Sequence, residues 1–206
     1  MSFKKYVYFF GSGKADGKAN MKNLLGGKGA NIAEMTNLGM AVPAGFTIST
    51  DACMAYYDND KKYPPGLWDE LQKNLLKLED TMSMKFGDSN DPLLLSVRSG
   101  ARVSMPGMMD TVLNLGLNDR TVKALAAKSN NDRFAYDSYR RFIMMFGDVV
   151  LEIKRENFED LLKKKKEEKN VKSDNQLSAD DLKELVDRYK AIVKNKKGFD
   201  FPEDPQ

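Results

Sequence analysis

Two adjoining stretches decide how this sequence is interpreted: LLLSV at residues 93–97 and RSGARVSMPGMMDT at residues 98–111. A short apolar run of this length is typical of a buried β-strand. In open α/β sheets, the loops that leave the ends of such strands gather around ligands. The sequence therefore predicts a buried strand over residues 93–97 and a ligand-binding loop over residues 98–111.

The residue types in this loop suit a phosphate group. Arg98 and Arg102 supply planar, permanently charged donors, and Gly100 and Gly107 allow backbone amides to converge on an anion. Further donors come from hydroxyl side chains, namely Ser99, Ser104 and Thr111. A structural loop whose arginines pair with acids explains the same residues almost as well. The methionines Met105, Met108 and Met109 either pack beneath the loop or line an apolar wall for a base or a protein partner.

A second candidate anion site is MKNLLGGKGAN at residues 21–31. Lys28 stands among three glycines just before a predicted helix over residues 28–38, and the N-terminus of a helix stabilises anions. The spacing differs from that of a Walker A motif. A flexible turn with an exposed lysine accounts for this segment equally well.

The elements along the chain predict an α+β fold. Strands are expected over residues 5–10 and 46–49. A helix over residues 67–86 is expected to carry an apolar stripe of Leu67, Leu71, Leu75, Leu76 and Leu78. Thr50 or Asp51 is expected to cap the helix that follows the second strand. After Asn118 only helices are expected, over residues 122–127, 134–150, 158–168 and 180–193, the last with a near-capping box from Ser178 to Asp181.

We accordingly predict a lobe of residues 1–115, in which a small mixed sheet packs with helices, and an all-helical lobe of residues 116–206. The proline-rich and acidic end, residues 201–206, is typical of a linker. On the helix over residues 134–150, Tyr139, Phe142 and Ile143 should point inward. The adjacent Arg140 and Arg141 are expected to form salt bridges, although one of them could instead face a nucleotide.

Composition narrows the function classes. The 206 residues are 41% hydrophobic and 31% charged, with a net charge of +3 and no histidine. This balance is typical of a globular domain and gives no support for a nucleic-acid or membrane partner. Histidine chemistry is excluded within this chain. The lysine-rich run at residues 163–169 is compensated by acids and predicts a solvated helix face. The single cysteine, Cys53, is expected to be buried, and a cytoplasmic location fits it.

Several segments, in the same order, resemble one known family. NLLGGKGANIAEM at residues 23–35, LSVRSGAR at 95–102, SMPGMMDT at 104–111 and RFAYDSYRRF at 133–142 are similar to the N-terminal domain of the dikinases that make phosphoenolpyruvate. The second half of this set favours the pyruvate phosphate dikinase family. The close alternative is phosphoenolpyruvate synthase, in which water replaces inorganic phosphate as an acceptor. A rival of another class is a non-catalytic interaction module that uses the three methionines.

The resemblance implies an ATP-grasp nucleotide-binding domain. Family residues that match Lys28 and Arg98 bind ATP phosphates and serve catalysis. The family loop that matches residues 100–111 covers these phosphates. Arg141 matches a family arginine less clearly. The resulting ATP-binding set is Lys28, Arg98, Ser99, Gly100, Ala101, Ser104, Met105, Gly107, Met109, Asp110, Thr111 and Arg141.

The resemblance also implies that this chain is a fragment, inactive alone. Its Mg²⁺ ligands, a phosphohistidine domain and a phosphoenolpyruvate domain would lie elsewhere in a full-length, homodimeric enzyme. No metal ligand is expected within this chain.

Overall fold

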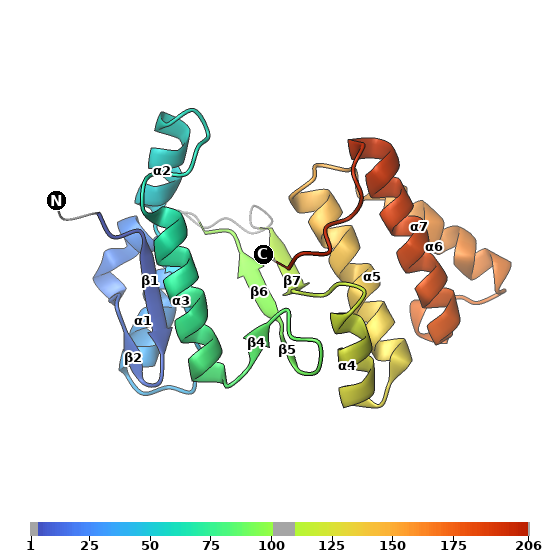
Figure 1. Cartoon of the computed structure of the whole chain (residues 1–206), viewed down its shortest axis with the longest axis horizontal. Helices are drawn as coiled ribbons and strands as arrows, with labels where there is room; N and C mark the ends of the chain where they lie inside the picture. Colours follow the sequence, from blue (N-terminus) through green and yellow to red (C-terminus); the bar gives the residue numbers. More distant parts are fainter. Residues whose placement is uncertain (1–3, 101–109, 206) are drawn as a thin grey trace. The chain divides into compact units, whose positions relative to one another are not determined.

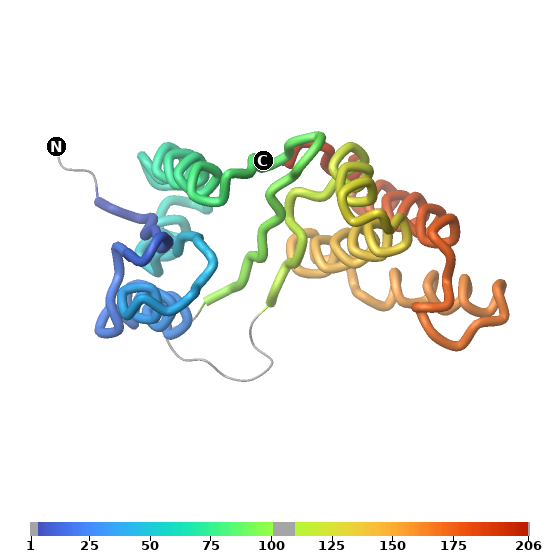
Figure 2. Tube along the Cα trace, turned by 90° about the horizontal axis from the view of Figure 1, so that it is seen from below, coloured from blue at the N-terminus to red at the C-terminus, as the bar shows by residue number. Residues whose placement is uncertain are grey.

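The computed structural model describes residues 4–100 and 110–205, which divide into two compact units. The first contains residues 4–83 with Ser99 and Gly100, and the second contains residues 84–98 and 110–205. Both units are drawn in Figures 1 and 2, and each is described here by itself. Helices and short strands occur together, so the predicted α+β class is confirmed.

The first unit is built around a three-stranded antiparallel sheet of order β2-β1-β3. Its strands are β1 (Val7–Gly11), β2 (Lys14–Ala15) and β3 (Gly45–Ile48). The helices of this unit are α1 (Lys22–Asn37), α2 (Thr50–Asp58) and α3 (Leu67–Met82), with a short 3-10 turn η1 (Ala19–Met21) before α1. Val7 pairs with Ile48 and Phe10 with Gly45, which fixes the register of the two longer strands.

Side chains from all three helices complete the core and the edge of this sheet. The carboxylate of Glu70 on α3 accepts hydrogen bonds from the backbone N–H groups of Tyr6 and Val7, both at 2.8 Å. This contact satisfies two donors at the start of β1 that would otherwise need water. Leu67, Leu75 and Leu78 of α3 are buried as predicted. Leu76 is 59% exposed, so its inclusion in the apolar stripe was wrong.

Two expectations for α2 are also corrected. The N-cap is Ser49, whose hydroxyl accepts from the N–H of Ala52 at 3.3 Å, and not Thr50 or Asp51. Cys53 is exposed rather than buried. Successive helix residues point in directions about 100° apart, and Ala52, which is 2% exposed, occupies the inward position.

The second unit combines four short strands with four helices. The strands are β4 (Lys85–Phe86) and β5 (Pro92–Leu93), which pair in parallel, and β6 (Leu95–Arg98) and β7 (Thr111–Leu115), which pair antiparallel. The helices confirm the four predicted ones: α4 (Thr121–Ser129), α5 (Asp132–Val149), α6 (Glu156–Glu168) and α7 (Ala179–Lys197). A 3-10 turn, η2 (Asp174–Gln176), connects α6 to α7.

A continuous hydrophobic core joins these helices to β7, and Tyr139, Ile143 and Tyr189 lie fully buried in it. The capping box at the start of α7 is confirmed. The Ser178 hydroxyl accepts from the N–H of Asp181 at 3.2 Å, and the Asp181 carboxylate accepts from the N–H of Ser178 at 3.0 Å. The first turn of α7 therefore has side-chain partners for amides that helix geometry leaves unpaired.

The prediction for residues 93–97 is confirmed as to strand structure, but one continuous buried strand is wrong. The run is broken, because β5 ends at Leu93 and β6 begins at Leu95. β6 pairs with β7, a strand that the residue pattern does not predict. Val97 is 49% exposed. An antiparallel pair can leave one face in water, which explains why Val97 is not buried.

Two other segments differ from expectation. The end of the chain packs instead of acting as a free linker. Phe201 is 4% exposed and lies edge-on to the rings of Phe142 and Phe146, with ring centroids 5.8 and 5.6 Å away. Within the lysine-rich run, Lys165 is 2% exposed and pairs with Glu184 of α7 at 2.5 Å. The division into functional lobes at residue 115 stays a prediction.

Candidate functional site

The most specific backbone feature near the predicted site is an interruption of α1 at Gly26. Its φ of 68° and ψ of 169° are not helical, and this region of backbone space is essentially restricted to glycine. The helix resumes directly afterwards, so Gly27, Lys28 and Gly29 form the first turn of its main segment. Amides in a first turn lack intrahelical acceptors, and the helix dipole favours an anion beside them.

The glycines around Lys28 have different physical roles. A Cβ on Gly29 would lie 2.8 Å from Cγ2 of Thr47, so glycine allows α1 to approach β3 closely. A Cβ on Gly27 would meet nothing within 4 Å. Lys28 itself is half-buried, and no carboxylate of the described residues lies within ion-pair distance of its Nζ. The first turn thus places a lysine with no ion pair among the described residues beside amides for which helix geometry provides no acceptors.

Arg98 and Thr111 are brought together by the β6–β7 ladder. Arg98 is the last residue of β6, Thr111 is the first of β7, and the two are Cα partners. Arg98 is exposed, and no acid of residues 4–100 and 110–205 forms an ion pair with it. The alternative in which this arginine pairs with an acid therefore has no support within the described chain.

The connection between these two residues is described only at its ends. Ser99, Gly100 and Asp110 are exposed, and a Cβ on Gly100 would meet nothing within 4 Å. The other predicted loop residues lie outside the described residues: Ala101, Arg102, Ser104, Met105, Gly107, Met108 and Met109. The predictions that rest on them stay predictions.

Arg141 lies on α5, where the expected inward positions of Tyr139, Phe142 and Ile143 are confirmed. The side chain of Arg141 is 56% exposed, and its Nη2 lies 3.0 Å from Oδ2 of Asp137. Arg140 instead points into the unit and pairs with the other oxygen of Asp137 at 2.5 Å. The predicted salt bridges are therefore present for both arginines.

Sequence reasoning missed two features of these segments. The first is the backbone break at Gly26, for which the available signal is a glycine pair directly before a lysine and a helical pattern. Asp137 was not singled out, although it precedes Arg140 by three residues and Arg141 by four, the spacings at which helix side chains meet.

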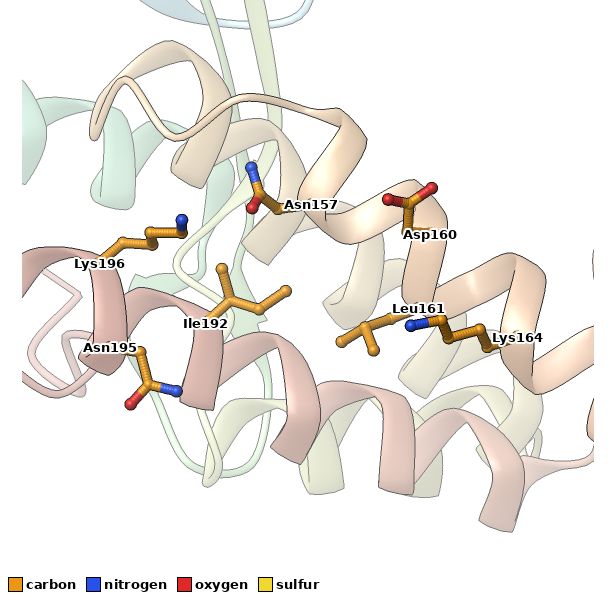
Figure 3. A pocket seen from close by; sticks show the side chains of 7 residues that line it. All are labelled: Asn157, Asp160, Leu161, Lys164, Ile192, Asn195 and Lys196. Carbon is orange, nitrogen blue, oxygen red and sulfur yellow. The ribbon is translucent and has the colours of Figure 1, made fainter.

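A shallow groove of about 260 Å³ lies between α6 and α7, as Figure 3 shows. Leu161 and Ile192 form its floor, and polar side chains line its rim: Asn157, Asp160, Lys164, Asn195 and Lys196. None of the predicted site residues lines it. Among residues 4–100 and 110–205 there is no cluster of three His, Cys, Asp or Glu side chains suited to a metal ion. Over the same residues, no helix is long and apolar enough to cross a membrane.

Comparison with known protein families gives a match to a segment of the first unit. The family model described as "Pyruvate phosphate dikinase, AMP/ATP-binding domain" matches residues 22–62, the segment that holds the Gly26 break and Lys28. Residues 22–62 are therefore similar to part of a nucleotide-binding domain of dikinase type.

Relatives extend the similarity to nearly the whole chain. "Pyruvate, phosphate dikinase, chloroplastic" of Flaveria pringlei is 57% identical over 203 residues, which is 98% of this chain and 21% of the relative. "Pyruvate, phosphate dikinase 1, chloroplastic" of Arabidopsis thaliana is 56% identical over the same shares. "Pyruvate, phosphate dikinase 2" of Zea mays is 56% identical over 97% of this chain and 22% of its own length.

Over nearly its whole length this chain is thus similar to a part of these pyruvate phosphate dikinases, and residues 22–62 match the model of their AMP/ATP-binding domain. It spans about a fifth of the length of the curated relatives that it matches.

Proposed function

We propose that this chain binds the phosphate groups of ATP through Lys28 and Arg98. In the intact protein, it would serve phosphoryl transfer from ATP to inorganic phosphate and, through a phosphohistidine on another domain, to pyruvate, giving phosphoenolpyruvate. The observation that carries the proposal is the helix break at Gly26, which lies inside the segment similar to AMP/ATP-binding domains.

The chemistry of phosphoryl transfer fits the groups found here. Such reactions depend on positioning and on neutralising charge more than on covalent participation by side chains. Lys28 would supply a point charge at a helix N-terminus, and Arg98 would supply a planar set of donors for phosphate oxygens. The loop that begins after Arg98 would cover the phosphates and exclude water. We assign the ATP contacts of residues 99–111 and Arg141 to the same proposal.

The remaining parts of the reaction would come from elsewhere in the intact protein. We expect Mg²⁺ to accompany ATP, with its protein ligands outside this chain, and a phosphohistidine domain to accept the phosphoryl group. We therefore expect the isolated chain to be inactive and the full-length enzyme to be a homodimer. We also keep the prediction of a cytoplasmic location, although the names of two of the relatives above carry the word chloroplastic.

Measuring ATP binding by the full-length protein tests the proposed phosphate contacts. We expect Lys28→Ala to weaken ATP binding by about tenfold or more, because hydrogen bonds to charged groups contribute roughly 1.5–3 kcal/mol. Lys22→Ala is the matched control, since Lys22 is an exposed lysine on the same helix. Titration calorimetry should show a change only for the first variant. Equal affinities for both variants would remove Lys28 from its proposed role.

The identity of the second acceptor needs its own test. Inorganic phosphate should be required for turnover of ATP and pyruvate by the protein as encoded, and pyrophosphate should accumulate. Turnover that proceeds without inorganic phosphate and releases phosphate instead would favour the water-dependent reaction of phosphoenolpyruvate synthase.

A further inference from the structure

Four side chains of the second unit form a chain of ion pairs that ends at Arg141. Asp174 of η2 lies 3.3 Å from Nη2 of Arg140, Arg140 lies 2.5 Å from Oδ1 of Asp137, and Oδ2 of Asp137 lies 3.0 Å from Arg141. The Asp174 side chain is 33% exposed, and from Arg140 towards Arg141 the exposure of the side chains rises. The Arg140 side chain is 2% exposed, that of Asp137 is 14% exposed and that of Arg141 is 56% exposed.

The inner part of this chain, around the buried Arg140, is held from several sides. Both Nε and Nη2 of Arg140 donate to the same oxygen of Asp137, at 3.0 and 2.5 Å. Asp174 is fixed in turn, because Lys166 donates to its carboxylate at 3.0 Å and Arg133 donates to its backbone carbonyl at 2.7 Å. Asp137 is therefore more constrained than a carboxylate in an ordinary surface pair between residues four positions apart.

The exposed end keeps donors available. A guanidinium has five N–H donors in a rigid plane, and the contact of Arg141 with Asp137 uses one terminal nitrogen. Ordering a long side chain before a ligand arrives reduces the entropy lost on binding. The carboxylate of Asp137 orders the half-exposed Arg141 in this way. The other N–H groups of the guanidinium stay available for an anion.

We propose that Asp137 is a positioning residue, which holds Arg141 ready for a phosphate group of ATP and is itself held by the buried Arg140. This inference rests on the proposed function, because ATP supplies the anion that Arg141 would contact. Asp137 touches no substrate in this arrangement and acts only through the arginine.

A double-mutant cycle on ATP affinity tests the proposal in the protein as encoded. Arg141→Ala should weaken ATP binding by about tenfold, and Asp137→Asn should weaken it several-fold. In the Arg141→Ala background, Asp137→Asn should have no further effect, because the residue through which it acts is gone. An equal loss in both backgrounds, or no loss in the wild-type background, would overturn the role of Asp137.

The same cycle separates this inference from the proposed function. If Lys28→Ala weakens ATP binding but Arg141→Ala does not, the positioning role is overturned and the ATP site stands. If the wild-type protein binds no ATP, both are overturned.

Asp137→Asn could unfold the second unit, because it leaves a buried arginine short of a charge partner. A measurement on the wild-type protein avoids this difficulty. Rotation of the Arg141 guanidinium, followed by NMR, should be several-fold slower than that of Arg120, an exposed arginine with no ion pair among the described residues. Equal rotation rates would contradict the proposal.

Discussion

Arg98 and Thr111 face each other as Cα partners at the end of the β6–β7 ladder. The chain therefore leaves the ladder after Arg98 and rejoins it at Thr111, directly opposite. The ladder fixes both ends of this connection, and Arg98 stands at its base with an exposed side chain. A phosphate-binding loop needs such an arrangement, because a charged donor must keep a constant position relative to the loop amides.

Replacing Arg98 should reduce phosphoryl transfer. In the protein as encoded, we expect Arg98→Ala to lower kcat/KM for ATP by about 100-fold, corresponding to roughly 2.7 kcal/mol of transition-state stabilisation. Arg120→Ala is the control from the same unit, and Lys163→Ala is a second exposed cation. Steady-state kinetics that give equal losses for all three variants would exclude a special role for Arg98.

The helix break at Gly26 should be intolerant of a side chain. We expect Gly26→Ala to destabilise the first unit by about 1–3 kcal/mol, because its backbone conformation is strained for any other residue. Gly27→Ala adds a methyl group in open space and should be neutral or stabilising by up to about 1 kcal/mol. Urea unfolding measures both. A Gly26→Ala protein as stable as wild type would show that the break is not required.

The packed C-terminal residues should contribute to stability. Phe201→Ala should destabilise the second unit by about 3 kcal/mol, since it empties a site between two aromatic rings. Phe199→Ala, at a position that is 46% exposed, should change stability by less than about 0.5 kcal/mol. Thermal unfolding that gives the same shift for both variants would contradict the observed docking of Phe201.

The capping box of α7 should make stability depend on acid pH. Hydrogen bonds from Lys169 and Ser178 lower the pKa of Asp181 from 3.8 to about 2. A carboxyl group with a lowered pKa in the folded state stabilises the fold above its ordinary pKa, and this contribution is lost as the pH falls towards 2.

Asp181→Asn should therefore cost most stability above about pH 4, and the difference from wild type should shrink between about pH 4 and pH 2. Chemical unfolding at a series of pH values measures this difference. Asp180→Asn is the control, because the Asp180 side chain is 91% exposed. A difference that stays constant down to pH 2 would show that the charge of Asp181 is not responsible.

Local sequence signals were sufficient for the helical part of the fold. The four helices after Asn118 follow from the spacing of apolar residues, and Ser178 with Asp181 marks a helix start through hydrogen bonds between near neighbours. Predictions of which helix side chains face the core were wrong at two positions. Leu76 and Cys53 are apolar and adjacent to buried residues, but a helix turns them toward solvent.

The sequence by itself determined the residue types available for binding a phosphate, the absence of histidine chemistry and the order of most elements. These depend on composition and on contacts between near neighbours. Only the tertiary structure decided that Arg98 and Thr111 meet, that α1 restarts at Gly27, that Lys165 and Phe201 are buried, and that Arg140 supports Asp137 behind Arg141. These features depend on backbone angles and on pairing between segments distant in the chain, which apolar spacing does not encode.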